Sequence, residues 1–571
     1  MGLMNDQGIS RRNLFKMGGI TATGVLGAAA LSSCGGKPAT SDGKTEKGSS
    51  FERGVTLEDF ESSAAELETI QDFSDEKTYD IVVVGAGTSG LPAVLTALEE
   101  GASVACLQKE SVPVAQGNGS SGLILDSAAS NLKGLLTWAQ EYRTALSYRV
   151  NEEMLDTYMR TSGETMLWMN KVSNEAGYPP AATTSQMSKH FADDSFVTIV
   201  SNNFGVKPES NNDLVVALAA HAEKLGADFF YSTPGVQLIT DESGAVTGVI
   251  GNSKDNGYIK FNANKAVILA CGDYQNNDSM MKKFSPEIDA FTRKQQGKTG
   301  DGILMGIAAG SRLCPVGHSH SLHDMDAAPL FMADFPLLAV NMNGERFMNE
   351  EIPMISWNQT LRQQRGAEDP GRFCRIFDDA YEEKISSWGG KPTPKASMEN
   401  YIPGFVENPV GVRPDLIDTH RCDTLDELAN ELGIPAEELK TSVERWNELC
   451  SNGFDEDFGL DAKYLKPIDT PPYWGVRQWV RITAVHSGFE VNGFNQALNE
   501  SGEVIPGLYG VGFTGGDLCG DVDWSFYLGG LCCGYCMTSG RYAVIHALTG
   551  AIEPSHPIAW SSEFAAQYGV A

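Results

Sequence analysis

The chain lacks several features that would identify a protein class directly. It has 43 Lys and Arg against 74 Asp and Glu, and its formal net charge of −31 argues against a nucleic-acid partner. Neither Cys-x-x-Cys-His nor His-Glu-x-x-His occurs, so we predict no covalently attached haem and no metal site. Its eleven cysteines are odd in number and scattered, which is not a disulfide framework. These absences leave an acidic globular protein, for which 571 residues predict two to four domains.

The N-terminal residues carry an export signature. Residues 10–16, Ser-Arg-Arg-Asn-Leu-Phe-Lys, resemble a twin-arginine motif, and an apolar run over 17–31 follows. The run is short for a membrane span and has the pattern of a signal-peptide core. It leads into Leu-Ser-Ser-Cys, which is similar to a bacterial lipobox ending at Cys34. The alternative is a basic start followed by a surface helix.

We therefore expect residues 1–34 to be a twin-arginine lipoprotein signal peptide. The protein would be exported by the twin-arginine route and anchored by a lipid on Cys34 at the extracytoplasmic face of the bacterial cell membrane. Residues 35–76 would then be a linker, since residues 35–50 are rich in Gly, Ser, Thr and Lys.

A glycine fingerprint follows the first apolar strand of the chain. The sequence Val-Val-Val-Gly-Ala-Gly-Thr-Ser-Gly over 82–90 has the spacing G-x-G-x-x-G, between a predicted strand at 80–84 and a predicted helix at 88–100. The first glycine permits the tight turn, the second admits a pyrophosphate and the third lets helix and strand pack closely. The pattern predicts a dinucleotide site whose contacts are Gly85, Gly87, Thr88, Ser89 and Gly90.

The next strand, predicted over 102–109, departs from the usual fingerprint. An acidic residue normally ends this strand and binds the ribose, but this chain has Gln108, followed by Lys109. An amide can accept from one ribose hydroxyl and donate to the other, so we expect Gln108 to keep the role.

A run of small residues at 116–122 follows. We predict a loop there that cradles phosphates or a flavin ring, and an ordinary loop is the alternative reading. Its candidate contacts are Gly117, Asn118, Ser120, Ser121 and Gly122.

The remaining pattern alternates helices and strands. Residues 131–178 and 211–225 are helical in pattern, and strands are expected at 236–240, 246–251 and 265–270, before a helix from 301 to 309. This order predicts an α/β fold.

The order of several motifs carries a family resemblance. After the fingerprint come Ala-Cys-Gly at 270–272, Thr-Gly-Asp-Gly at 299–302, Arg-Phe-Met-Asn-Glu at 346–350 and Pro-Gly-Leu-Tyr-Gly-Val-Gly at 506–512. In this order they resemble the FAD-dependent fumarate reductase/succinate dehydrogenase flavoprotein superfamily over residues 77–550. Its members include urocanate- and cinnamate-type reductases and 3-ketosteroid dehydrogenases.

The resemblance implies a fold and a cofactor. FAD would bind a Rossmann-like domain built from residues 77–314 and 485–571, with an α+β capping domain inserted at 315–484. The further cofactor contacts that it implies are Val236, Ala270, Gly272, Asp301, Gly512, Leu528, Gly529 and Gly530.

Two departures from the family bear on the substrate. Fumarate reductases carry a proton-donating arginine four residues after the glutamate of the Arg-Phe motif, where this chain has Met354. They carry a carboxylate-binding arginine before the C-terminal Leu-Gly-Gly, where this chain has Tyr527. Without either cation a dicarboxylate would be uncompensated, at a cost of several kcal/mol per buried charge, so we predict a substrate other than fumarate.

The resemblance and the remaining polar groups suggest four catalytic candidates. Tyr527 resembles a carbonyl-binding tyrosine of ketosteroid dehydrogenases, and packing is its alternative role. His486 lies near the position of a substrate-binding histidine, or is a structural histidine. Arg481 is the surviving cation, unless it pairs with a carboxylate. His320 belongs to a cluster with His318 and His323, which surface exposure would explain equally well.

The last predicted helix opens with Cys532, Cys533 and Cys536. An iron–sulfur cluster or a redox disulfide is one reading, and close packing against a flavin is the one we favour. Cys271 and Cys519 are likewise interpreted as packing residues.

Together these features predict an exported FAD-dependent oxidoreductase acting on CH–CH groups. We expect it to reduce an activated C=C bond in an enone or acrylate-type small-molecule electron acceptor, by hydride transfer from flavin N5. No haem domain is expected, so electrons would come from a separate donor such as a quinol-linked cytochrome. One alternative is a 3-ketosteroid dehydrogenase working in reverse. Another is a non-catalytic flavoprotein electron carrier or ligand-binding lipoprotein.

Overall fold

The computed structural model describes most of the chain after residue 68. The described residues are 69–126, 129–189, 195–205, 210–314, 318–322, 335–352, 357–364, 367–407, 409, 412, 417–516, 518–520 and 528–560. Within these ranges no helix has the length and apolar character needed to cross a bilayer. The predicted signal peptide and Cys34 lie outside the described residues.

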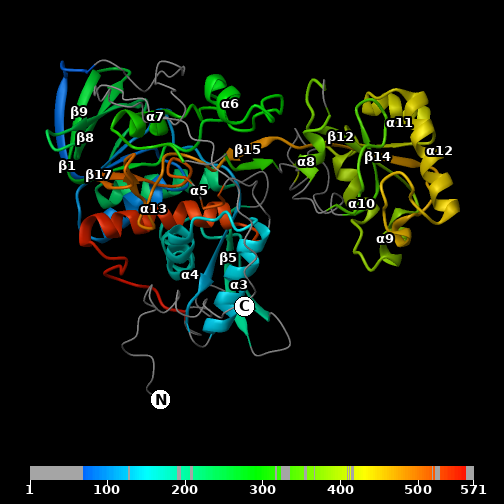
Figure 1. The fold of residues 1–571 in the computed structure, drawn as a ribbon, viewed down its shortest axis with the longest axis horizontal. Coiled ribbons are helices and arrows are strands. Elements are labelled where there is room, and N and C mark those ends of the chain that lie inside the picture. The colour runs from blue at the N-terminus through cyan, green and yellow to red at the C-terminus, as the bar shows by residue number, and fades with distance from the viewer. Residues whose placement is uncertain are drawn as a thin grey trace, which may run out of the picture. The chain divides into compact units, whose positions relative to one another are not determined.

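The largest sheet among the described residues is a mixed sheet of eight strands (Figure 1). Its main path runs β16-β17-β9-β1-β2-β6, and its four central pairings, from β17 to β6, are parallel. Strands from both ends of the sequence therefore share one sheet, as the FAD-binding expectation requires. The strands are β1 (Asp75–Val84), β2 (Val104–Leu107), β6 (Asp228–Phe230), β7 (Gly235–Thr240), β8 (Val246–Ser253), β9 (Gly257–Leu269), β16 (Gln496–Leu498) and β17 (Val504–Gly510).

The central strand β1 is buried on both faces. Ile81 and Val83 pack into one core with helix α2 (Gly90–Glu99), while Val82 and Val84 pack into a second core on the opposite face. Such two-sided burial explains the continuous apolar run in the sequence. Helix α13 (Leu531–Thr549) packs against α2, so the C-terminal segment covers the first βα unit.

A smaller antiparallel sheet, β3-β5-β4, lies against the long helix α4. Glycines permit this approach, since a Cβ on Gly122 would lie 2.3 Å from the Ser162 carbonyl oxygen. The prediction of a loop over 116–122 is wrong from Gly119 onward, because serines with little strand propensity are held there by pairing with β5. The elements are β3 (Gly119–Ile124), α3 (Leu132–Ala145), α4 (Glu152–Glu175), β4 (Ala182–Lys189), β5 (Phe196–Asn203) and α5 (Asn211–Leu225).

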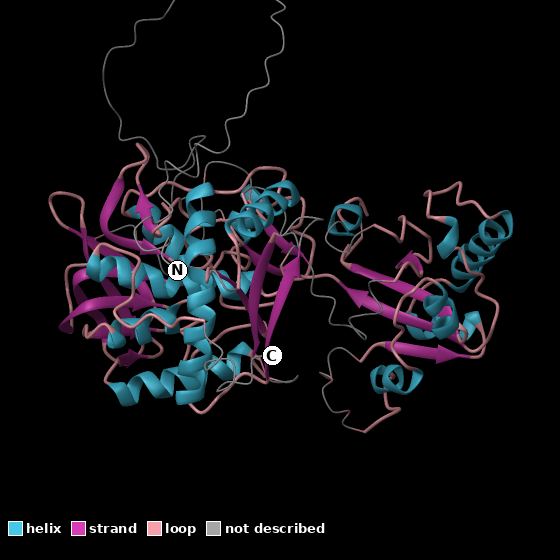
Figure 2. Cartoon of the chain, turned by 90° about the horizontal axis from the view of Figure 1, so that it is seen from below, coloured by secondary structure: helices cyan, strands magenta, loops and turns pink. Residues whose placement is uncertain are grey.

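A separate antiparallel sheet, β11-β12-β14-β13, carries its own helices (Figure 2). It has its own apolar core. Its position in the chain agrees with an inserted α+β cap, whose boundaries at 315 and 484 stay a prediction. The elements are β11 (Leu338–Asn341), α8 (Trp357–Leu361), β12 (Arg372–Asp378), α9 (Tyr381–Ser387), α10 (Lys395–Met398), β13 (Thr419–Cys422), α11 (Leu425–Leu432), α12 (Ala436–Asn452) and β14 (Tyr473–Trp479).

Two short strands lie where the chain enters and leaves this insertion. Strand β10 (His320–Leu322) pairs antiparallel with β15 (Ile482–Val485), which places His320 opposite Val485. Before them come α6 (Asp278–Phe284) and α7 (Asp301–Ala308). The fold therefore brings the histidine cluster beside the segment that leads to His486.

Candidate active site

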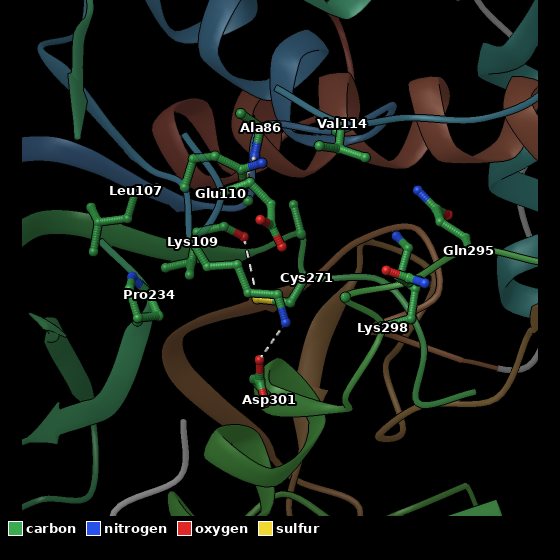
Figure 3. A pocket seen from close by; sticks show the side chains of 18 of the residues that line it. Ala86, Leu107, Lys109, Glu110, Val114, Pro234, Cys271, Gln295, Lys298 and Asp301 are labelled. Carbon is green, nitrogen blue, oxygen red and sulfur yellow. Dashed lines mark hydrogen bonds and ion pairs between the residues drawn. The ribbon is translucent and has the colours of Figure 1, made fainter. Parts of the chain in front are cut away.

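A cavity of about 370 Å³ opens at the carboxyl ends of the parallel strands (Figure 3). Open α/β sheets bind their ligands at this edge. Six predicted contacts line it: Gly85, Gly87, Gln108, Lys109, Ala270 and Asp301.

The glycines of the fingerprint form a tight turn between β1 and α2. Gly85 has φ +109°, and a Cβ on Gly90 would lie 1.8 Å from the Gly85 carbonyl oxygen. A Cβ on Gly87 would meet only the Val114 carbonyl oxygen, at 3.3 Å, so the turn is open on its cavity side. Helix α2 begins at this turn with no side-chain cap and no acidic residue in its first turn. Its amides therefore suit a diphosphate.

Lys109 and Asp301 join two motifs across the cavity (Figure 3). Lys109 Nζ lies 2.9 Å from Asp301 Oδ2 and donates to Thr299 Oγ1, also at 2.9 Å. The other carboxylate oxygen of Asp301, Oδ1, is buried without a hydrogen-bond partner among the described residues. A ligand hydroxyl would satisfy this acceptor.

Gln108 lines the cavity, but its side chain is bound to the backbone. Its Oε1 accepts from Ala86 N at 3.3 Å and its Nε2 donates to Val112 O at 2.9 Å. Each amide atom has further hydrogen-bonding capacity, so its contact with a ribose stays a prediction.

One wall of the cavity is a basic segment that was not among the predicted contacts. Residues 294–298, Lys-Gln-Gln-Gly-Lys, line the cavity together with Glu110 and Pro234. The segment has two lysines, separated by polar residues and a glycine, and it directly precedes Thr-Gly-Asp-Gly. Such a pattern suits a phosphate, and it is the signal by which the sequence could have indicated this wall.

A second group of predicted contacts surrounds the start of α13. Ser121 Oγ donates to Gly529 O at 2.6 Å, and a Cβ on Gly117 would lie 2.9 Å from Cys533 Sγ. Ser120 Oγ and Asn211 Oδ1 are buried here without hydrogen-bond partners in the described structure. These two polar atoms and the small residues fit an FAD whose ring reaches α13.

The other predicted contacts lie outside the wall of the cavity. Gly272 follows β9, where a Cβ would meet Lys298 Nζ at 2.3 Å, and Gly512 packs on Ser89. The remaining predicted contacts lie in four places. Thr88 is in the glycine turn, Asn118 precedes β3, Val236 is in β7, and Leu528 and Gly530 precede α13.

His486 is 3% exposed and lies beside α13. Its Nε2 lies 2.8 Å from Ser321 Oγ and 3.7 Å from Cys532 Sγ, and its ring stacks on Phe513 with centroids 4.4 Å apart. The backbone amide of His486 donates to Ser319 O at 2.9 Å. The histidine is thus held where β10, β15 and α13 meet.

His318 and His320 are both buried. The alternative that these histidines are merely exposed on the surface is therefore excluded. His320 Nε2 lies 2.8 Å from Ser285 Oγ, and His318 Nδ1 is hydrogen-bonded to Tyr274 OH. Arg362, which no sequence motif indicated, places its Nη2 3.4 Å from His320 Nδ1. Burial lowers the pKa of His318 to about 3, so this ring is neutral.

Arg481 lies between β14 and β15, and its guanidinium stacks on Trp479 at 4.4 Å from the ring centroid. Tyr527, Met354 and His323 lie outside the described residues.

The C-terminal cysteines have no metal-site geometry. No group of His, Cys, Asp and Glu that could hold a metal was found among the described residues. Burial raises the pKa of the thiols of Cys532 and Cys536, which disfavours the thiolate that a metal or a disulfide exchange requires. Cys271 and Cys519 form no disulfide bond.

Comparisons with known proteins agree with this geometry. The family described as FAD binding domain matches residues 80–532. The chain is 27% identical to a vinyl phenol reductase of Lactiplantibacillus plantarum, over 82% of this chain and 96% of that protein. It is 25% identical to a fumarate reductase (cytochrome) of Shewanella frigidimarina, over 82% and 76%. The open conformation of a flavocytochrome c3 fumarate reductase shares the fold, with a TM-score of 0.62 and 20% identity over 84% of this chain and 79% of that one. The chain therefore belongs to the FAD-binding family of fumarate reductase-like flavoproteins and is an FAD-dependent oxidoreductase acting on CH–CH groups.

Proposed function

We propose that this protein reduces an activated C=C bond in an enone or an acrylate-type acceptor, and that fumarate is not its main substrate. The observation that carries the proposal is the buried His486 beside the first turn of α13. Its Nε2 lies 2.8 Å from the Oγ of Ser321 in β10. The family membership and the similarity to a vinyl phenol reductase over nearly its whole length support it.

The residues around His486 would bind and polarise the acceptor. FAD, when bound, supplies a hydride from N5 to the β-carbon of the double bond. His486 or Ser321 would donate a hydrogen bond to the activating carbonyl, which stabilises the negative charge that develops on its oxygen. Phe513 and Cys532 beside them are apolar or neutral, so the donor acts in a site of low dielectric.

The same surroundings oppose a dicarboxylate. Three of the side chains in contact with His486 are Ser321, Phe513 and Cys532, and none of these three is cationic. They offer a carboxylate no opposite charge, whereas a neutral carbonyl needs only a donor.

A reoxidation screen tests the proposal. The holoenzyme is reduced without oxygen, and its reoxidation by enones, aromatic acrylates and fumarate is followed by the absorbance of the flavin. Fast reoxidation by an enone or an acrylate and slow reoxidation by fumarate are expected. Preferred reoxidation by fumarate would contradict the proposal, and reduction of the oxidised enzyme by saturated ketones would favour the ketosteroid dehydrogenase direction. An enzyme that reacts with none of these compounds would be a carrier or a binding protein.

We also propose that the protein works outside the cytoplasm with a separate electron donor, such as a quinol-linked cytochrome. The twin-arginine motif and Cys34 support the location. Replacing Arg11 and Arg12 by lysine should retain the precursor in the cytoplasm, and Cys34→Ala should abolish labelling by a radioactive fatty acid. Normal lipid labelling of Cys34→Ala would refute the anchor.

A further inference from the structure

Two successive backbone amides at the end of β15 are bound on opposite edges of the strand. The amide of His486 donates to Ser319 O at 2.9 Å, on the edge that pairs with β10. The amide of Val485 donates to Asp273 Oδ2 at 3.2 Å, on the other edge. The strand therefore cannot rotate about its own axis without breaking one of these hydrogen bonds, which fixes the direction of the His486 side chain.

The carboxylate of Asp273 is held in turn by Gln275, and both residues are at most 1% exposed. Asp273 Oδ1 accepts from Gln275 N at 2.9 Å, and Gln275 Nε2 lies 3.3 Å from Oδ1 and 3.2 Å from Oδ2. Gln275 Nε2 also donates to Thr483 O at 3.1 Å, and Gln116 Nε2 donates to the same oxygen at 2.7 Å. Three side chains from two distant segments thus bind this second edge of β15.

A carboxylate is a costly group to bury at this position. Burial raises the pKa of Asp273, against the opposing effects of the Lys298 charge and of the amides of Gln275 and Val485. An apolar side chain would avoid the desolvation, but it could not accept a hydrogen bond from Val485 N. The retained carboxylate therefore serves the position of β15.

Asp273 also follows directly on the wall of the FAD cavity. Cys271 lines that cavity (Figure 3), and Gly272 turns the chain with φ +75°. Asp273 is thus two residues from the cofactor wall and is hydrogen-bonded to the residue before His486. Its carboxylate joins the place where FAD binds to the histidine that we assign to the acceptor.

We propose that Asp273 is a positioning residue for the acceptor site. Its carboxylate holds the second edge of β15 and so sets the direction of His486 relative to the FAD cavity, while His486 itself contacts the acceptor. The inference rests on the proposed function, since it takes His486 as the group that binds the activating carbonyl.

Two variants of Asp273 and one matched control test this role. Asp273→Ala removes both carboxylate oxygens, whereas Asp273→Asn keeps one oxygen that can accept from Val485 N. The control is Asp378→Ala. Asp378 is also 1% exposed, and its Oδ2 accepts from the amides of Asp469 and Thr470 at 2.9 and 3.0 Å. Both carboxylates bind the backbone of a distant segment, but that of Asp378 binds the segment before β14 rather than β15.

The first test measures kcat/KM of each holoenzyme for the best acceptor of the reoxidation screen. Asp273→Ala should lower kcat/KM about tenfold with unchanged FAD content, because His486 would be misdirected. Asp273→Asn should recover part of the loss, and Asp378→Ala should match the wild type. In a His486→Ala background, Asp273→Ala should cause no further loss, since a positioning residue acts through the group that it positions. A second loss of about tenfold in that background would overturn the proposal.

The second test needs no acceptor. In holoenzyme labelled with ¹⁵N-histidine, the ring resonances of His486 are identified by their absence from His486→Ala. Asp273→Ala should shift these resonances, Asp273→Asn should shift them less, and Asp378→Ala should leave them in place. Unshifted His486 resonances in Asp273→Ala would overturn the proposal. Should Asp273→Ala fail to fold, Asp273→Asn decides alone, and wild-type values of both its kcat/KM and its His486 resonances would overturn the proposal.

Failure of the proposed function gives a different result. If the His486 resonances shift as expected but no acceptor reoxidises the wild-type enzyme, the proposed function fails, while the positioning of His486 by Asp273 stands.

Discussion

The Arg541 guanidinium binds both oxygens of Glu164, with Nε to Oε2 and Nη2 to Oε1 each at 3.0 Å. It also reaches Glu99 through Nη1 at 2.8 Å. Arg541 has no exposed side-chain surface, so this buried pair of bridges joins α13 to α4 and α2. The helix whose first turn adjoins His486 is therefore fixed by charge as well as by apolar packing.

We predict that Arg541→Met destabilises the protein by about 3–5 kcal/mol, because Glu99 and Glu164 lose their common partner while they stay largely buried. Unfolding by urea, followed by fluorescence, measures this change. Lys440→Met is the control, since its pairs with Asp426 and Glu437 lie on the surface, and it should leave the unfolding midpoint nearly unchanged. Equal effects of the two substitutions would show that α13 does not depend on the buried bridges.

We predict different results for alanine at two glycines of the fingerprint. Gly90→Ala places a Cβ 1.8 Å from the Gly85 carbonyl oxygen, so both the melting temperature and the FAD content should fall. Gly87→Ala has only one contact, at 3.3 Å, so it should fold and bind FAD weakly because the methyl group faces the cavity. Differential scanning fluorimetry and the flavin absorbance of the purified protein distinguish these outcomes. Full FAD occupancy in Gly87→Ala would contradict the predicted path of the diphosphate.

We predict that Lys109→Met raises the dissociation constant for FAD about tenfold or more, since the buried Asp301 carboxylate would lose its cation beside the ligand. Binding is measured by titrating the apoprotein and following flavin fluorescence. Lys77→Met, which breaks an exposed pair with Asp75 away from the cavity, should bind FAD normally.

We predict that His486→Ala lowers kcat/KM about 100-fold or more for the acceptor found by the reoxidation screen, because the hydrogen bond to the activating carbonyl would be lost. FAD content should be unchanged. His420→Ala, on β13 and paired with Asp418, is the control for removing a histidine that has no contact with His486 among the contacts given above. An unaffected rate in His486→Ala would leave His486 with a structural role.

We predict that stability falls as pH decreases from about 6.5 toward 3, in part through His318. The folded protein binds a proton at His318 only near pH 3, whereas the unfolded chain binds it near 6.5, so the unfolded state holds more protons in this window. The contribution is complete above pH 6.5 and is lost as pH falls toward 3. The free energy of unfolding of the wild type and of His318→Gln is measured with urea at several pH values. The slopes of this free energy against pH should differ by up to about 1.4 kcal/mol per pH unit. Parallel pH dependences would show that His318 is not buried as a neutral ring.

Local sequence was sufficient for the FAD-binding unit. The strand over 80–84 and the helix after the glycine turn were predicted from a buried apolar run and the spacing of Gly85, Gly87 and Gly90. These interactions act within one βα turn, so they are fully encoded in adjacent residues. The FAD assignment likewise came from motifs whose order along the chain is visible.

The strand β3 and the surroundings of the histidines could not be obtained in this way. Gly119 to Gly122 have weak strand propensity and become a strand only because β5 pairs with them and α4 packs against their glycines. The link between His320 and Ser285 spans 35 residues, and the one between His486 and Ser321 spans 165. The sequence by itself determined a dinucleotide site through local turn chemistry, and the family resemblance carried by the order of its motifs implied FAD and the reaction class. Only the tertiary structure decided which polar side chains meet beside α13, because those contacts arise from the closure of distant segments around a common core.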